Sequence, residues 1–170
     1  MMPLSEILKI DGWMNEAELK KLAELCKGKR VLEIGSYKGR SSCAIANVAT
    51  EICCLDTFKA GADGQTQDGD TLEDFKRNTK SFANLYLPED GMFEEKDFDV
   101  VFIDGMHTAD GVAMDVRAHE NRLKADGLFI FHDYEEGWPG VVYAVDLLFT
   151  EKPKTMKGGS LAWIGKDKLK

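Results

Sequence analysis

Short apolar runs alternate with stretches of helical periodicity along the chain, and this alternation limits the folds that the sequence can adopt. The runs with the length and composition of strands are Arg30–Gly35, Glu51–Phe58, Asn84–Leu87, Asp99–Asp104 and Leu128–His132. Because a helix that connects two such strands must pack back onto the sheet, the alternation indicates parallel strands covered on both faces. The sequence therefore predicts an α/β fold with a doubly wound sheet.

Helices are expected between these strands. Asn15 and Glu18 have the spacing of a capping box at the start of an N-terminal helix. The later helices are expected over residues 41–48, from Asp70 or Thr71 through Leu72, Phe75 and Phe82, from Ala109 through Leu123 to a stop at Gly127, and from Pro139 to about Thr150. The polar, glycine-rich stretch Lys59–Asp70 is interpreted as a loop that forms a lid.

The end of the chain predicts a change of strand direction. Two short strands are expected on either side of the pair Gly158-Gly159. A turn this short joins only antiparallel neighbours, so the last strand should run against the others. A purely parallel dinucleotide-binding sheet lacks this reversal.

Composition favours one globular domain. No linker divides the 170 residues, so a single domain over residues 1–170 is expected, with an N-terminal helical segment (1–28) and a core (29–170). The net charge of −8 disfavours a nucleic-acid partner, and the longest apolar runs are too short to span a membrane. Four cysteines without a Cys-x-x-Cys pair fit reduced thiols in the cytoplasm. Whether the chain forms a homo-oligomer is left open.

The sequence VLEIGSYKGRSS (31–42) places a glycine-containing turn directly after the first strand, where open α/β sheets bind ligands. A dinucleotide fingerprint counted from Gly35 requires glycine where this chain has Tyr37 and Arg40, so a pyrophosphate fits poorly. A ligand with a carboxylate and an ammonium group, such as S-adenosylmethionine, suits this turn better, and Asp56 is placed to bind its ribose hydroxyls. In the alternative interpretation, the two glycines of the turn only permit close packing and Asp56 only caps a loop.

Three motifs stand in order at the predicted strand ends: EIGSYKGRS, IDGMH and HD. With them the sequence resembles a class I S-adenosylmethionine-dependent methyltransferase, in particular the compact, O-methyltransferase-like subset that acts on small molecules. The resemblance extends from IDGW at Ile10 to LAWIGK near the end of the chain. It implies a Rossmann-like, seven-stranded sheet that is mostly parallel, with the last strand antiparallel and helices on both faces.

The resemblance also implies roles for individual residues. Those expected around the methionine portion of the cofactor are Glu33, Gly35, Ser36, Tyr37, Gly39 and Ser41. Asp56 and Thr57 would contact the ribose, and Asp104 would lie beside the amino group or the sulfonium. The adenine contact is not placed, because the stretch PEDGMFEEKD (88–97) is too short and acidic for the helix that relatives carry after the third strand.

His107 is the candidate catalytic base, with Asp104 beside it. It lies three residues beyond a strand end, and an ordinary imidazole titrates near pH ~6.5, which suits proton removal from a hydroxyl. Alternatively, His107 only caps the helix that begins near Thr108.

Asp104 and Asp133 end strands that should be neighbours, so they are candidate ligands for Mg²⁺ or another divalent ion that orients an acceptor. Some metal-binding members of the family carry a further carboxylate where this chain has His132, and others have an acid in place of Met106. This difference counts against the metal.

The sequence thus predicts a cytoplasmic methyltransferase that acts on a small molecule, most readily on a hydroxyl group of a sugar or secondary metabolite. No Asn/Asp-Pro-Pro-Tyr/Phe motif, which would suit methylation of a base nitrogen, follows the fourth strand. The alternative is a non-catalytic module that binds S-adenosylmethionine on a methyltransferase-like fold.

Overall fold

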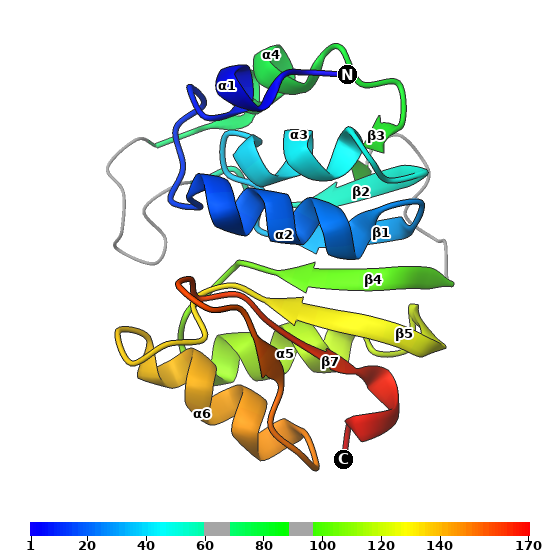
Figure 1. Ribbon diagram of the computed structural model, residues 1–170, viewed down its shortest axis with the longest axis vertical. Coiled ribbons are helices and arrows are strands. Elements are labelled where there is room, and N and C mark those ends of the chain that lie inside the picture. The colour runs from blue at the N-terminus through cyan, green and yellow to red at the C-terminus, as the bar shows by residue number, and fades with distance from the viewer. Residues whose placement is uncertain (60–68, 89–96) are drawn as a thin grey trace.

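The computed structural model describes residues 1–59, 69–88 and 97–170, and within them it forms a seven-stranded sheet (Figure 1). The strand order is β3-β2-β1-β4-β5-β7-β6. The strands are β1 (Arg30–Ile34), β2 (Glu51–Leu55), β3 (Leu85–Tyr86), β4 (Phe98–Ile103), β5 (Leu123–Phe131), β6 (Lys154–Thr155) and β7 (Ala162–Gly165). Strands β1 to β5 pair in parallel, whereas β7 pairs antiparallel with both β5 and β6. The predicted fold class and the reversal of the last strand are confirmed.

Two sets of helices cover opposite faces of the sheet (Figure 1). One set comprises α1 (Leu4–Ile7), α2 (Glu16–Cys26), α3 (Arg40–Ala46) and α4 (Leu72–Thr79), and the other comprises α5 (Ala109–His119) and α6 (Pro139–Leu148). Successive strand residues point to opposite faces, so Val31 and Leu32 belong to different core clusters. A short 3₁₀ helix (Lys166–Lys168) lies close to the end of the chain.

The start of α2 is the capping box that its sequence predicts. The Asn15 side chain accepts hydrogen bonds from the backbone N–H groups of Ala17 (2.9 Å) and Glu18 (3.1 Å). In return, Glu18 Oε2 accepts a hydrogen bond from the Asn15 N–H at 3.0 Å. This fixes the Glu18 side chain, whose other oxygen reaches the candidate site.

The expected helix from Ala109 to Gly127 is too long. Helix α5 ends at His119, and Leu123 already belongs to β5, where it pairs with Phe98 of β4 across an irregular register. Leu123 is buried by this pairing, and Gly127 lies inside the strand, packed on the Leu123 side chain, rather than at a helix end. Similarly, α4 ends at Thr79, so Phe82 packs against the core from beyond the helix.

The interpretation of Lys59–Asp70 as a lid falls mostly outside the described residues, as does most of the acidic stretch 88–97. The two ends of the first stretch, Lys59 and Asp70, form an isolated antiparallel bridge. Within the described parts of the chain, no helix combines the length and the apolar character needed to cross a bilayer.

Candidate active site

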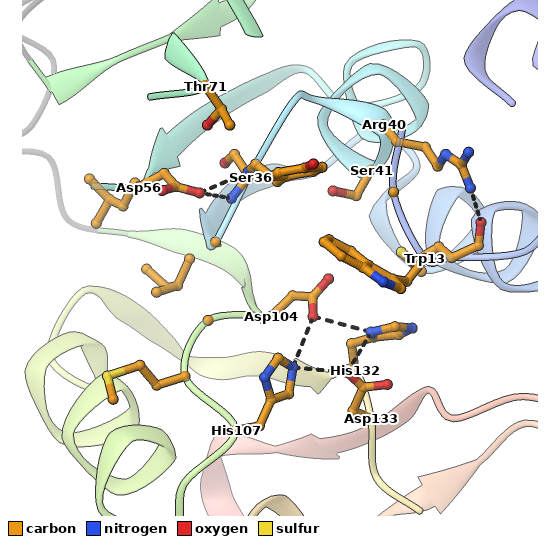
Figure 2. Close-up of a pocket in the computed structure, with 18 of the residues that line it drawn as sticks. Trp13, Ser36, Arg40, Ser41, Asp56, Thr71, Asp104, His107, His132 and Asp133 are labelled. Atoms are coloured by element: carbon orange, nitrogen blue, oxygen red, sulfur yellow. Dashed lines mark hydrogen bonds and ion pairs between the residues drawn. The ribbon is translucent and has the colours of Figure 1, made fainter. Parts of the chain in front are cut away.

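A cavity of about 550 Å³ opens at the carboxyl ends of the central strands (Figure 2). Its walls come from the turn after β1, the ends of β2, β4 and β5, the loop before α2 and one side of α5. Of the predicted site residues, those that line it are Gly35, Ser36, Tyr37, Ser41, Asp56, Thr57, Asp104, His107 and Asp133. Glu33 and Gly39 are not among the lining residues.

Asp56 holds the turn after β1 in place. Its Oδ2 atom accepts hydrogen bonds from the backbone N–H groups of Ser36 and Tyr37, both at 2.7 Å (Figure 2). Its Oδ1 atom accepts from the N–H of Phe58 at 2.6 Å. Tyr37 and Phe58 both have positive φ angles of 47° and 54°, which side chains rarely adopt without support. The carboxylate therefore stabilises two unusual backbone conformations at the cavity wall.

Glu33 supports the same turn from below. It is fully buried, and its carboxylate accepts hydrogen bonds from the hydroxyls of Ser36 (2.8 Å), Ser41 (2.6 Å) and Ser42. Burial raises the pKa of Glu33, although the three serine hydroxyls oppose this shift. The structure thus places Glu33 beneath the turn and not on the cavity wall where direct contact with a ligand was expected.

The two glycines of the turn have packing roles. A Cβ on Gly35 would lie 2.1 Å from the carbonyl oxygen of Asp104, so only glycine lets the ends of β1 and β4 approach this closely. Gly39 has φ of 90°, and a Cβ there would lie 2.9 Å from the Thr79 methyl group. The alternative interpretation therefore accounts for Gly39, while Gly35 both permits close packing and lines the cavity.

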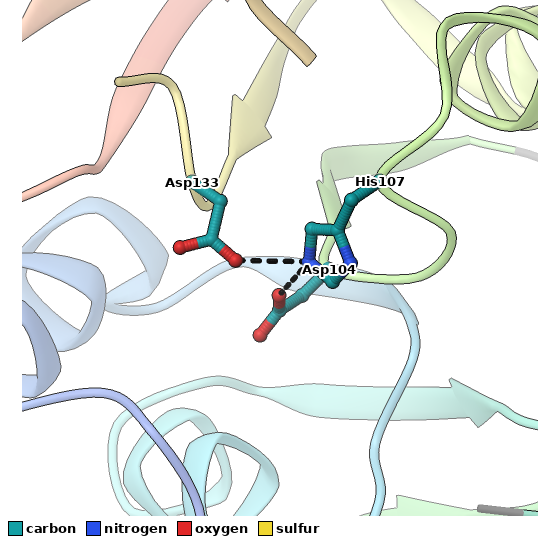
Figure 3. Close-up of side chains that lie close together, drawn as sticks. All are labelled: Asp104, His107 and Asp133. Atoms are coloured by element: carbon teal, nitrogen blue, oxygen red, sulfur yellow. Dashed lines mark ion pairs between the residues drawn. The ribbon is translucent and has the colours of Figure 1, made fainter. Parts of the chain in front are cut away.

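Asp104, His107, His132 and Asp133 form an ionic cluster beyond β4 and β5 (Figure 2), and Figure 3 shows three of them without His132. His107 Nε2 lies 2.9 Å from Asp133 Oδ2 and 3.9 Å from Asp104 Oδ1. His132 Nδ1 lies 3.1 Å from Asp104 Oδ1 and 3.3 Å from Asp133 Oδ2. The structure thus brings the predicted Asp104, His107 and Asp133 together and adds His132 between the two aspartates. Because Thr108 supplies the side-chain cap of α5, His107 is not needed as a cap.

The ion pairs of this cluster shift its titration. Burial lowers the pKa of His107, but hydrogen bonding and charge attraction from Asp104 and Asp133 outweigh it and raise the pKa to about 9. Burial likewise opposes the shift at His132, where Asp104 is the main cause of a raised pKa. Burial raises the pKa of each aspartate, yet the two histidines lower both values overall. The free protein therefore carries charged imidazoles here at neutral pH.

Glu18 is a member of this site that the sequence analysis missed. It is 4% exposed, and its Oε1 atom lies 3.7 Å from His132 Nε2 and accepts hydrogen bonds from Ser160 N–H (2.8 Å) and Ser160 Oγ (3.1 Å). Burial raises the pKa of Glu18, but His132, Ser160 and Asn15 lower it to about 2. No local sequence pattern indicates this contact, because Glu18 and Ser160 are 142 residues apart.

The loop before α2 contributes an aromatic wall. Arg40 donates hydrogen bonds to the carbonyl oxygens of Leu8, Ile10 and Met14, at 3.1, 2.5 and 3.0 Å. This holds Trp13 against Tyr37, with ring centroids 5.0 Å apart, while 59% of Trp13 remains exposed. Trp13 lines the cavity, as does Trp138, whose ring centroid lies 4.4 Å from that of His107.

Asp104, His107 and Asp133 also offer ligand atoms that all lie within 4.8 Å of one another (Figure 3). Two carboxylates and one imidazole form a donor set that suits a divalent cation. The set fits such an ion once His107 has lost its proton, since a protonated imidazole cannot act as a ligand.

The strand order with the reversed strand β7 is the arrangement of a class I methyltransferase. A family model described as a methyltransferase domain matches residues 32–134. The chain therefore belongs to this methyltransferase family. No curated protein matches the sequence.

Solved methyltransferases share the fold at low sequence identity. An S-adenosylmethionine-dependent O-methyltransferase from Thermotoga maritima is 13% identical with a TM-score of 0.66, over 95% of this chain and 70% of that chain. A putative O-methyltransferase from Klebsiella pneumoniae is 17% identical with a TM-score of 0.65, over 95% and 87%. An O-methyltransferase from Bacillus cereus, solved in complex with SAH (S-adenosylhomocysteine), is 14% identical with a TM-score of 0.64, over 95% and 88%.

Proposed function

We propose that the protein transfers the methyl group of S-adenosylmethionine to a hydroxyl oxygen of a small molecule. The observation that carries this proposal is one cavity in which Asp56 and the turn after β1 lie beside the cluster of Asp104, His107 and Asp133. The relatives named O-methyltransferases, one of them with bound SAH, support the cofactor and the acceptor atom.

In this proposal the cofactor lies across the strand ends. Asp56 binds a ribose hydroxyl with the lone pair of Oδ1 that its three backbone hydrogen bonds leave free, and Asp104 attracts the ammonium or sulfonium charge. Ser36, Tyr37, Ser41 and the aromatic wall enclose the methionine portion. Thr57 follows Asp56 along the cavity wall and is a second ribose contact.

His107 removes the proton from the acceptor hydroxyl. It must first lose its own proton, because Asp104 and Asp133 hold its pKa at about 9 in the free protein. A cationic sulfonium beside Asp104 weakens the attraction that keeps this proton on His107, so cofactor binding favours the neutral imidazole. Trp138 beside His107 then forms the apolar wall for the acceptor.

A divalent ion, if bound, would be held by Asp104, His107 and Asp133 and would supply a Lewis acid that lowers the pKa of the acceptor hydroxyl. His107 cannot serve as ligand and base together. Dependence of turnover on an added divalent ion would therefore favour the metal, and turnover in the presence of a chelator would favour His107 as the base.

A screen of hydroxyl-bearing small molecules for release of S-adenosylhomocysteine tests the proposal. We expect His107→Ala to reduce turnover about 10²–10⁴-fold while cofactor affinity is nearly unchanged, since a general base acts on the acceptor. His119→Ala, on the far end of α5, is the matched control and should keep full turnover. Unchanged turnover per folded molecule in His107→Ala would remove it from the mechanism, and release only with amine or thiol acceptors would contradict O-methylation.

A further inference from the structure

Helix α5 presents one acidic side chain to the cavity that the chemistry above does not use. Asp115 lines the cavity from the middle of α5 and is half-buried. Among residues 1–59, 69–88 and 97–170, no hydrogen bond or ion pair to its carboxyl group is found. Burial alone raises the pKa of Asp115 to about 6. A carboxyl group kept partly desolvated without a partner needs a compensating function.

The cavity has an apolar floor next to Asp115. Ile34 and Leu55 are paired neighbours at the ends of β1 and β2, and both face the α5 side of the sheet and line the cavity. Asp115 Oδ2 lies 3.2 Å from the position of a Cβ on Gly105, and the Ile34 methyl group lies 3.7 Å from that position on the other side. Gly105 thus leaves the carboxyl group and the apolar floor in contact with the same space.

The elements that form this part of the cavity differ from those that form the aromatic wall. Trp13 lies in the loop before α2 and Tyr37 in the turn before α3, whereas Ile34, Leu55 and Asp115 belong to the α5 side of the sheet. A cofactor whose ribose contacts Asp56 and whose methionine portion lies near Tyr37 must therefore direct its base toward Asp115. A flat purine suits the apolar floor, and its amino group requires a hydrogen-bond acceptor at the edge.

We propose that Asp115 recognises the adenine of the cofactor by accepting a hydrogen bond from its exocyclic 6-amino group. This assignment rests on the proposed use of S-adenosylmethionine and adds the residue that selects the base. Met106, which is 51% exposed and also lines the cavity, then covers the ring from the solvent side. The bond satisfies the carboxyl group for which the described residues of the free protein supply no partner.

Calorimetric titration with two ligands tests the assignment directly. The ligands are S-adenosylhomocysteine and its analogue in which hydrogen replaces the 6-amino group of the purine. The proteins are the wild type, Asp115→Ala, Asp115→Asn and the control Asp110→Ala, which removes an exposed acid from the first turn of the same helix. Thermal unfolding of each variant reports whether it is folded.

We expect the wild type and Asp110→Ala to bind S-adenosylhomocysteine about 10-fold or more tightly than the analogue, as for a hydrogen bond to a charged group. Asp115→Ala should bind both ligands with one affinity, close to that of the wild type for the analogue. Asp115→Asn, which keeps an acceptor oxygen, should restore part of the preference. A merely structural role of Asp115 would lower both affinities and leave their ratio unchanged.

Different results would contradict the assignment of Asp115 and the proposed function. If the wild type binds S-adenosylhomocysteine but does not distinguish it from the analogue, or if Asp115→Ala keeps the wild-type ratio, the assignment of Asp115 is wrong and the proposed function stands. If the folded wild type binds neither ligand, both proposals are wrong.

Discussion

Replacing Asp56 should damage the fold and the cofactor site together. The carboxylate accepts three backbone hydrogen bonds, two at 2.7 Å and one at 2.6 Å, and two of the donors, Tyr37 and Phe58, have positive φ angles. Asp56→Asn keeps one acceptor oxygen but turns an amide NH₂ toward a backbone N–H. We therefore expect Asn to be little better than Ala at this position.

The expected loss of stability follows from these contacts. A hydrogen bond to a charged acceptor contributes about 1.5–3 kcal/mol when buried, and less where water can replace it. For three partly buried bonds we expect Asp56→Ala to lower the free energy of unfolding by about 2–4 kcal/mol. At about 2–4 °C per kcal/mol for a chain of this length, the melting temperature should fall by about 5–15 °C.

The assay separates stability from binding. Thermal unfolding of the ligand-free variant measures the first effect, and calorimetry with S-adenosylhomocysteine well below the melting temperature measures the second. We expect the affinity to fall by about 5–150-fold from loss of the ribose contact. Asp126→Ala, an exposed acid in β5, is the control. A ligand-free melting temperature within 2 °C of the wild type would refute the structural reasoning, and unchanged affinity would refute the ribose assignment.

Three further changes are expected to alter stability. Arg40→Ala removes three hydrogen bonds to carbonyl oxygens and should cost about 2–4 kcal/mol, with a change in Trp13 fluorescence as the loop before α2 is released. Gly35→Ala should prevent folding or lower the free energy of unfolding by more than about 3 kcal/mol, since its Cβ would lie 2.1 Å from a backbone oxygen. Gly28→Ala is the control: no atom lies close to the new Cβ, so the free energy of unfolding should fall by only about 1 kcal/mol in thermal unfolding. Asp115 has a pKa of about 6 in the folded protein and about 3.9 in the unfolded chain, so its ionisation destabilises the fold as the pH rises from about 4 to 6. Asp115→Asn should therefore raise the free energy of unfolding by about 1–2 kcal/mol at pH 7.5 and by nearly nothing below pH 4. Denaturant titration at both pH values measures this difference.

The alternation of apolar runs and helical periodicity predicts the sheet because each run is buried on both faces by its own connections. It fails for the boundary between α5 and β5, because the sequence ENRLKADG after His119 contains no strong strand pattern and no helix stop before Gly127. The start of β5 is decided by the pairing of Leu123 with Phe98 on β4, a tertiary contact. A helix pattern continued through Leu123 is therefore the natural error.

The candidate site likewise contains residues that the sequence predicts and residues that it does not. Asp56 and Asp104 follow strand ends directly, and His107 and Asp133 lie shortly beyond strand ends. Parallel strands bring such residues to one edge of the sheet, so the sequence predicts that they line the same cavity. Glu18, by contrast, reaches His132 from α2. No local pattern encodes such a contact, because it depends on how a helix packs against the sheet.

In the turn after β1, the residues that disfavour a pyrophosphate also have a structural role. Tyr37 and Arg40 occupy the positions where a dinucleotide fingerprint requires glycine, so the sequence predicts that a pyrophosphate fits poorly. In the structure these two side chains attach the N-terminal loop: Arg40 binds its carbonyl oxygens and Tyr37 packs against Trp13. That loop forms one wall of the cavity. The two residues that make the turn unsuitable for a pyrophosphate, Tyr37 and Arg40, therefore also hold in place the aromatic wall against which the methionine portion of the cofactor is proposed to lie.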